Sequence, residues 1–282
     1  MVSMDQMPRR RSSKVPHSCG VDLPGDRARC CPVCGRRASA LSGVPAGPGR
    51  RRARRRASTA RPDSWRRPSD PPVAHTGGVP SVVRSTFTGA ARCFADLVGH
   101  IPATAWDGAG LGVWDLRSLV GHTGRAVSTV ATYLQRPAAE ERVPSAARYY
   151  ALLKQQNVVD HSAVAERGRQ AGSGLGPQPA RTVHTLVEET LLALDAVTGD
   201  PVIDTFVGGM RLSAYLPTRT FELTVHSLDI AAASGLEVTL PPQALGDALH
   251  LAIDVALICG DGQTLLRALT GRRPLPNTYS IV

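Results

Sequence analysis

The sequence predicts an all-α fold, a helical bundle that occupies the chain from about residue 81 onward. Three observations support this prediction. Apolar residues recur at helical spacing through most of that region, the periodic segments have the length of bundle helices, and moderate loops containing Gly or Pro separate them. The absence of G-x-G-x-x-G, P-loop and G-x-S-x-G motifs excludes the common dinucleotide, nucleotide and α/β-hydrolase sites.

Residues that start or stop helices set the predicted boundaries. Ile101-Pro102 ends the first helix, Asp115 is a suitable N-cap for the second, and Gly199-Asp-Pro201 stops the fourth. The third helical segment has a break near Asn157. The predicted helices cover residues 82–100, 115–134, 145–170, 180–198, 219–233, 243–258 and 263–269. Residues 202–210 are rich in β-branched side chains, so we expect an extended linker or a short strand there.

Residues 1–80 differ in composition from residues 81–282. They contain 17 basic and 5 acidic residues, whereas residues 81–282 contain 16 and 18, so the net charge of +10 belongs to the N-terminal part. That part is rich in Arg, Pro, Ser and Gly without periodic apolar residues, which predicts a disordered leader before a helical domain over 81–282. The arginine run at 50–56 is either a solvated tail or a patch for nucleic acid. Valines at 79, 82 and 83 also allow a native start there, in which case the leader is a mis-called extension.

Cysteine and hydropathy patterns bear on the compartment. Four cysteines lie in the leader and Cys93 and Cys259 stand alone, so no disulfide framework is predicted. We find no apolar run close to the roughly 20 residues of a membrane helix and no hydrophobic core after the basic N-terminus. We therefore expect a cytoplasmic protein without a membrane partner. Residues 81–282 are slightly acidic and give no support to nucleic-acid binding.

The segment 219–229 carries the densest group of chemically active side chains. At about 100° per residue they fall in one charged stripe: Arg219, Glu222, His226 and Asp229. A hydroxyl strip lies roughly opposite and is the better candidate for the solvent face: Thr220, Thr224 and Ser227. The charged stripe is then expected to point inward. Glu222 and His226, four residues apart, can bind one divalent ion as H-E-x-x-H helices do, or form an ordinary surface pair.

Two segments, Trp114-Asp-Leu-Arg-Ser-Leu-Val-Gly-His122 and Arg219-Thr-Phe-Glu-Leu-Thr-Val-His-Ser-Leu-Asp229, carry a resemblance to a known family. They resemble the W-x-(V/L)-R-D-L-V-x-H and R-x-x-E-x-x-x-H-x-x-D motifs of mycothiol-dependent maleylpyruvate isomerases and their DinB-like relatives. The ending at 266–276 is also similar to that of short family members. The resemblance covers about residues 82–276 and implies a DinB-like four-helix bundle with extra C-terminal helices. It also implies a homodimer, because DinB-like bundles often pair.

The resemblance implies a metal site. In the family the metal, usually assigned as zinc, is held by the histidine of the first motif and the glutamate and histidine of the second. Carried over, the ligands are His122, Glu222 and His226, with a fourth position open to a thiol such as mycothiol. Asp229 either orients a histidine or an incoming ligand as a catalytic residue or is an ordinary helix charge. Arg219 either meets a carboxylate of a substrate as a catalytic residue or pairs with Glu222.

The implied function is activation of a low-molecular-weight thiol for isomerisation or for S-transfer to an electrophile. In the isomerases the thiol adds to a cis double bond, which permits rotation, and its loss gives the trans product. The full isomerases carry a second, smaller α/β domain after the bundle, and we expect none in residues 81–282. S-transfer to another electrophile is therefore as consistent with the sequence as isomerisation. Two alternatives remain: a metal-binding bundle without catalysis, such as a sensor or degenerate enzyme, and a nucleic-acid-associated protein acting through the arginine run.

Overall fold

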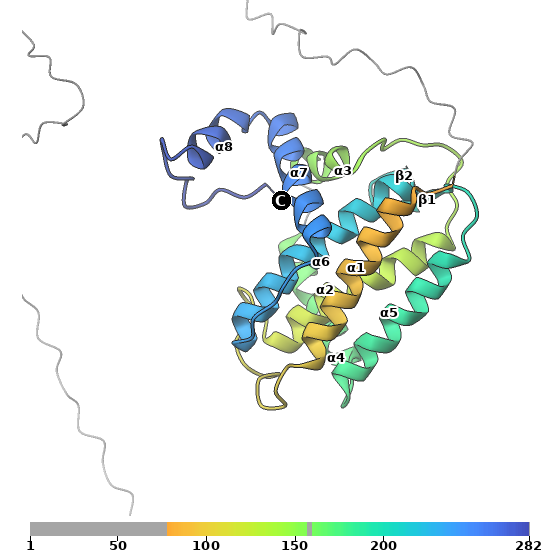
Figure 1. Ribbon diagram of the computed structural model, residues 1–282, viewed down its shortest axis with the longest axis vertical. Coiled ribbons are helices and arrows are strands. Elements are labelled where there is room, and N and C mark those ends of the chain that lie inside the picture. Colours follow the sequence, from red (N-terminus) through yellow and green to blue (C-terminus); the bar gives the residue numbers. More distant parts are fainter. Residues whose placement is uncertain (1–77, 157–159, 282) are drawn as a thin grey trace, which may run out of the picture. The chain divides into compact units, whose positions relative to one another are not determined.

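A computed structural model describes residues 78–156 and 160–281, which form eight α-helices and one two-stranded hairpin (Figure 1). The elements are α1 (Ser81–Gly99), α2 (Leu116–Leu134), α3 (Ala146–Gln156), α4 (His161–Gly174), α5 (Pro179–Asp195), β1 (Val202–Thr205), β2 (Gly208–Arg211), α6 (Leu212–Ser234), α7 (Pro242–Cys259) and α8 (Gly262–Leu269). The predicted leader lies outside the described residues except for residues 78–80. Of these, Val79 is buried and belongs to the hydrophobic core.

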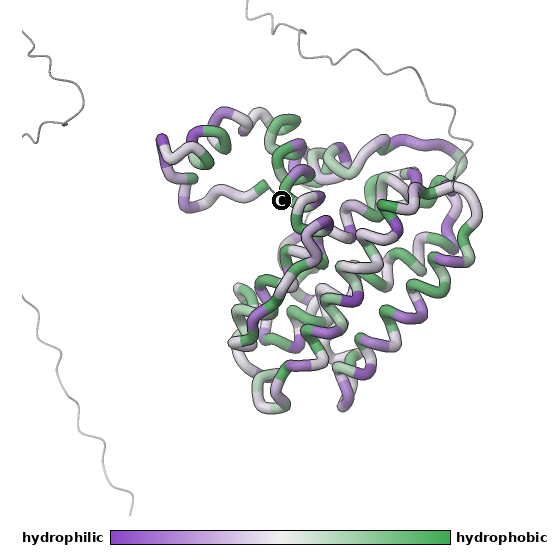
Figure 2. Tube along the Cα trace, in the orientation of Figure 1, coloured by the Kyte–Doolittle hydropathy of each residue, from purple (hydrophilic) through white to green (hydrophobic). Residues whose placement is uncertain are grey.

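Four of the helices, α1, α2, α5 and α6, form a bundle in which each helix packs against two others of the set. Helix α4 packs on α2, while α3 and α7 pack on α6 and on each other. Helix α8 packs on α7. Hydrophobic residues recur along every bundle helix (Figure 2), and their buried members form one continuous core. The predicted all-α bundle with additional C-terminal helices is confirmed.

Local signals in the sequence account for most of the boundaries. The Asp115 carboxylate accepts a hydrogen bond from the backbone N–H of Ser118 at 2.7 Å, which confirms the predicted N-cap of α2. The third predicted segment is two helices, α3 and α4, on either side of the predicted break. Residues 202–211 form an antiparallel hairpin with Thr205 opposite Gly208, so the short-strand alternative is the correct one. Helix α6 begins at Leu212, about two turns before its predicted start, and contains Pro217 near its N-terminus.

The hydroxyl strip of α6 is buried, and the prediction that it faces solvent is wrong. Thr220, Thr224 and Ser227 are 3%, 2% and 1% exposed. Helix α6 packs against α1, α2, α3 and α7, so nearly all of its sides are covered. The Thr224 hydroxyl donates to the carbonyl of Thr220 at 2.7 Å, and this bond satisfies it without water. The charged stripe is half-buried on the remaining side.

Helices α2 and α4 cross with their backbones in contact at two glycines. A Cβ atom on Gly121 of α2 would lie 2.2 Å from the backbone nitrogen of Gly172 in α4. A Cβ atom on Gly172 would lie 2.8 Å from the carbonyl oxygen of Arg117. Neither position has room for a side chain, since real Cβ atoms do not approach backbone so closely. This crossing fixes α4 on α2, the helix that carries His122.

Helix α7 is the one helix of the described residues with the length and composition of a membrane span. Its 18 residues have a mean hydropathy of 1.2. The prediction that no apolar segment approaches this length therefore has an exception. A single such helix is weak evidence for a membrane, because core helices of soluble proteins have the same composition.

Gly121→Ala should destabilise the fold by about 2 kcal/mol, because the new methyl group forces α2 and α4 apart. The matched control is Gly174→Ala at the end of α4, where a Cβ atom meets nothing within 4 Å. The control should be neutral or slightly stabilising, because alanine restricts the unfolded chain. Urea unfolding followed by circular dichroism measures both changes. Equal unfolding midpoints for the two variants would contradict the close crossing.

Candidate metal centre

Three residues from two helices bring metal-ligating atoms together at the crossing of α2 and α6. His122 lies on α2, and Glu222 and His226 lie one turn apart on α6. One ligand atom from each of the three lies within 4.8 Å of the others. The spacing of Glu222 and His226 places both side chains on one helix face. The folding of the bundle then adds His122, about 100 residues away in the sequence.

His226 lies between two carboxylates. Its Nε2 is 3.3 Å from Oε2 of Glu222, and its Nδ1 is 3.0 Å from Oδ2 of Asp229. Burial alone would lower the pKa of His226, but the hydrogen bonds to Asp229 and Glu222 outweigh burial and raise it to about 9. Without a metal, His226 is therefore a cation at neutral pH. Asp229 holds Nδ1, which leaves Nε2 as the nitrogen directed at the three-residue cluster.

Glu222 is held by Tyr150 of α3 as well as by His226. The Tyr150 hydroxyl donates to Oε1 of Glu222 at 2.7 Å and is also 3.0 Å from the carbonyl of Thr218. Burial alone would raise the pKa of Glu222, but the hydrogen bond from His226 and the charge of Arg219 outweigh burial and lower it to about 2. Glu222 is therefore ionised, with Oε1 fixed by Tyr150 and Oε2 directed at His226.

His122 is the member of the cluster without a polar partner. Within residues 78–156 and 160–281, neither of its ring nitrogens has a hydrogen bond to protein, although the side chain is half-buried. Its ring stacks on Trp114, with centroids 4.4 Å apart, and contacts the His226 ring edge to face at 5.1 Å. Burial, with the nearby charge of His226, lowers the pKa of His122 to about 4. His122 is thus a neutral imidazole with a free lone pair.

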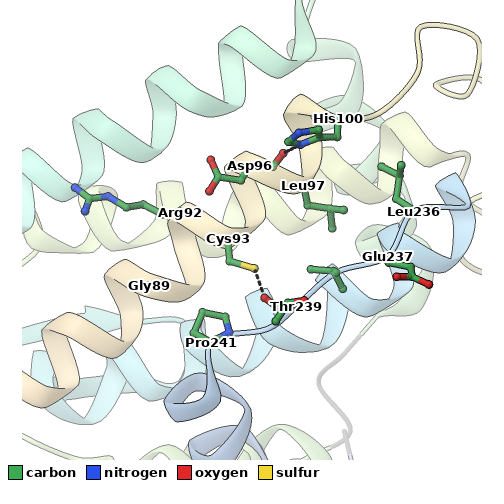
Figure 3. Close-up of a pocket in the computed structure, with 11 residues that line it drawn as sticks. Gly89, Arg92, Cys93, Asp96, Leu97, His100, Leu236, Glu237, Thr239 and Pro241 are labelled. Carbon is green, nitrogen blue, oxygen red and sulfur yellow. Dashed lines mark hydrogen bonds between the residues drawn. The ribbon is translucent and has the colours of Figure 1, made fainter.

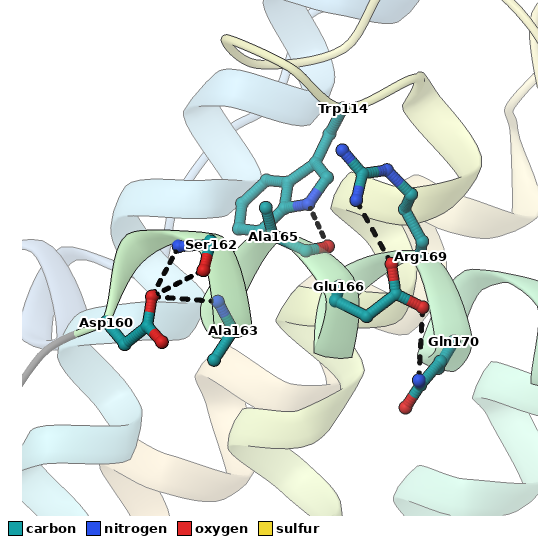
Figure 4. A network of polar contacts seen from close by, with 8 residues as sticks. All are labelled: Trp114, Asp160, Ser162, Ala163, Ala165, Glu166, Arg169 and Gln170. Carbon is teal, nitrogen blue, oxygen red and sulfur yellow. Dashed lines mark hydrogen bonds and ion pairs between the residues drawn. The ribbon is translucent and has the colours of Figure 1, made fainter.

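Helix α4 fixes the position of Trp114, the residue whose ring packs on His122, and Figure 4 shows the contact between Trp114 and α4. The indole N–H donates to the carbonyl of Ala165 at 2.9 Å. A Cβ atom on Gly168 would lie 2.6 Å from the indole ring, so this glycine makes room for it. In the same view Asp160 caps the start of α4 by accepting from the backbone N–H groups of Ser162 and Ala163. Helix α4 therefore contacts both the backbone of α2 and Trp114, the residue whose ring packs on His122.

Arg219 lies one turn before Glu222 and has no carboxylate within ion-pair distance among the described residues. Its guanidinium lies over the rings of Tyr215 and Tyr149, at 5.1 and 5.7 Å from their centroids. Its Nε donates to the Thr218 hydroxyl at 3.0 Å. The predicted direct pair with Glu222 is not formed, although the positive charge of Arg219 still acts on that carboxylate.

A separate hollow of about 520 Å³ lies between α1 and the segment 236–241, and it contains none of these residues (Figure 3). Cys93 is its one nucleophilic side chain. The thiol donates to the carbonyl of Thr239 at 3.7 Å, and burial together with Asp96 raises its pKa. Cys93 is therefore kept as a thiol, which is the unreactive form. The chemistry of the described residues is concentrated at the crossing of α2 and α6.

The structure brings four of the five predicted site residues into one connected group: His122, Glu222, His226 and Asp229. Arg219 lies beside this group without touching it through an ion pair. Metal binding by the three ligands remains a prediction. Nothing in the sequence marks Tyr150 as a site residue, because it lies on another helix and has no spacing relation to Glu222. Trp114 was noted only as part of a motif, and its stacking on His122 is visible only in the fold.

One comparison with known proteins bears on these residues. The family model of the mycothiol maleylpyruvate isomerase N-terminal domain matches residues 87–231, from α1 to α6. No curated protein and no solved structure gives a significant match. The matched range covers half of the chain and contains all five predicted site residues. The chain therefore belongs to the family of the mycothiol maleylpyruvate isomerase N-terminal domain.

Proposed function

We propose that the chain is a metal-dependent enzyme that activates a low-molecular-weight thiol, such as mycothiol, for isomerisation or S-transfer at an electrophilic carbon. The observation that carries the proposal is the position of His122 beside Glu222 and His226. Its imidazole is half-buried and neutral and has no hydrogen-bond partner among the described residues, so a ring nitrogen is available to bind a metal ion. A metal ion shared with Glu222 and His226 would satisfy it, since its ligand atom already lies within 4.8 Å of theirs.

The donor set fits zinc. Two imidazole nitrogens and one carboxylate oxygen form the three-ligand arrangement of catalytic zinc sites, which keep a fourth position open. A zinc ion held there would supply a position at which a thiol binds in its deprotonated, nucleophilic form. Asp229 fixes the tautomer of His226, and Tyr150 occupies Oε1 of Glu222 so that Oε2 is directed at the site. Both contacts orient ligands in the way that such outer groups do in metal enzymes.

The charges of the chain's own residues favour an anionic fourth ligand. Without a metal, Glu222 and Asp229 are balanced by protonated His226 and by Arg219. A divalent ion in place of the His226 proton leaves the group with one excess positive charge. A thiolate restores neutrality, whereas water does not unless it loses a proton. Arg219, which has no carboxylate partner, is the group we propose to meet a carboxylate of the thiol or of the electrophile.

The alternative is a metal-binding or purely structural bundle without catalysis. The favouring observation is that His226 already contacts both Glu222 and Asp229, so the α6 charges are satisfied by each other. This alternative accounts for α6 but leaves His122 without a partner. The two interpretations differ in metal content and in thiol chemistry, which the following experiments measure.

The purified chain should contain about one zinc per molecule, as expected for a three-ligand site. His122→Ala and Glu222→Ala should each lose it, because two ligands hold zinc poorly. The matched control is His184→Ala, which removes an exposed histidine of α5 far from the cluster in the sequence and should retain the metal. Elemental analysis after dialysis against a weak chelator gives the ratio. Retention of zinc by His122→Ala would reject the three-ligand site.

Zinc binding should release about one proton per site at pH 7. His226, with a pKa of about 9, must lose its proton to bind, whereas His122, with a pKa of about 4, is already neutral. Raising the pH from 6 to 8 should therefore strengthen binding by about tenfold per unit. Calorimetry in two buffers of different ionisation enthalpy counts the protons. Asp229→Asn should reduce the release, because Asp229 is a main cause of the raised pKa. Binding without proton release would mean either that His226 is already neutral before zinc binds or that it is not a ligand, and the zinc content of His226→Ala distinguishes the two cases.

The zinc-loaded chain should turn over cis-enoates in the presence of mycothiol, and His122→Ala should not. Monomethyl and dimethyl maleate form a matched pair that differs in one carboxylate. Arg219→Gln should lower kcat/KM for the monoester by about tenfold or more and leave the diester nearly unchanged. A thiol reagent and proton NMR distinguish consumed thiol, which indicates S-transfer, from recovered thiol with a trans product. Full zinc content without thiol-dependent turnover of either ester would favour the non-catalytic bundle.

A further inference from the structure

Helix α7 has an apolar stripe on its outer side. Leu245, Leu249, Ile253 and Leu257 recur every fourth residue and therefore share one face. They are 39%, 57%, 38% and 61% exposed. The opposite face of the same helix is buried on α3 and α6 through small and branched residues such as Ala248 and Val255. A helix that is apolar on both sides is expected where both sides are covered.

Helix α8 extends the exposed apolar surface. None of its eight residues is buried, and Leu266 and Leu269 are 63% and 70% exposed. The stripe of α7 reaches the start of α8, because a Cβ atom on Gly262 would lie 2.7 Å from Cδ2 of Leu257. We define the α7–α8 face as Leu245, Leu249, Ile253, Leu257, Leu266 and Leu269. In Figure 1 the two helices lie at one end of the bundle, and Figure 2 shows hydrophobic residues along α7 there.

The short helix α8 is held in place at both ends. Gly260 ends α7 in the left-handed conformation and turns the chain toward α8. Lys154 of α3 lies 3.4 Å from the Asp261 carboxylate before α8 and donates to the carbonyl of Ser280 after it at 2.9 Å. The same ammonium lies 5.9 Å from the centre of the Tyr279 ring. An eight-residue helix is marginal by itself. These tethers present its leucines to solvent in a fixed position.

The charges around the α7–α8 face are of both signs. Asp247 and Asp254 lie on α7, and Arg267 lies on α8, followed by Arg272 and Arg273. None of the three arginines has a carboxylate within 4.0 Å in the part of the chain that the structure describes. A membrane surface or an anionic partner would favour a face of one sign. A face with apolar, acidic and basic parts can pair with a second copy of itself, and a two-fold dimer needs such a face.

We propose that the α7–α8 face is the contact between two copies of this chain. An antiparallel pair of α7 helices brings the Asp247 end of one towards the Arg267 end of the other. The leucine stripes then cover each other, which removes their exposed apolar side chains from water. The face lies beyond residue 231, where the match to the family model ends. The proposal does not depend on metal or thiol binding.

Sedimentation equilibrium of the full chain at micromolar concentration tests the proposal. The wild type should have twice the mass of one chain, which is 29.8 kDa. Leu257→Arg should raise the dimer Kd by about 30-fold or more, and Arg267→Glu by about tenfold. The matched control is Leu192→Arg on α5, which changes an equally exposed leucine (69%) outside the face and should remain a dimer. Circular dichroism of each variant confirms the helical fold.

A wild-type monomer at these concentrations would overturn the proposal, and so would a dimer that withstands both substitutions. Co-sedimentation of a monomeric wild type with phosphatidylcholine–phosphatidylglycerol vesicles would also overturn it, in favour of a membrane contact. A variant that dissociates with unchanged zinc content would support the contact independently of the metal centre. Because Leu257 and Arg267 are exposed, their substitution leaves the packing of the bundle intact.

Discussion

The placement of two carboxylates on a helix covered on several sides is the constraint that the rest of the site serves. Charges at such depth are costly unless they are paired. His226 meets this requirement in two directions, with Glu222 at 3.3 Å and Asp229 at 3.0 Å. Tyr150 and the positive charge of Arg219 complete the neutralisation of Glu222. The cluster is therefore balanced by the chain's own residues, and the His226 proton takes the role that a divalent ion would assume.

The second requirement is the orientation of His122 on α2, and glycines where α2 and Trp114 meet α4 contribute to it. Without side chains at Gly121 and Gly172, α4 lies directly on the backbone of α2. Gly168 then leaves space for Trp114, whose N–H bond to Ala165 fixes the ring that stacks on His122. The close packing of α4 on α2 thus also fixes the Trp114 ring that contacts the His122 imidazole. Contacts with the rings of Trp114 and His226 restrict the rotamer of His122, which a preorganised metal ligand needs.

The local part of this arrangement could be predicted from the sequence, and the nonlocal part could not. Glu222, His226 and Asp229 follow from helical spacing on one element, and the N-cap at Asp115 follows from residue type. The addition of His122 depended on a family resemblance, because no spacing rule joins two distant helices. The polarity of the hydroxyl strip predicts a solvent-facing position, because the sequence does not show which other helices pack against α6. Threonine satisfies its own hydroxyl within a helix, so such a strip can be buried between other helices. Tyr150 had no sequence signal at all.

Helix α3 connects the candidate metal centre with the C-terminal helices α7 and α8. Tyr150 in its first half holds Oε1 of Glu222, and Lys154 one turn later holds the residues before and after α8. The same helix packs against both α6 and α7. Because α3 is packed on both sides, a shift that changes its contacts with α6 also disturbs its contacts with α7. The contacts of α3 therefore link the carboxylate that Tyr150 orients to the C-terminal helices α7 and α8, which lie outside the matched family domain.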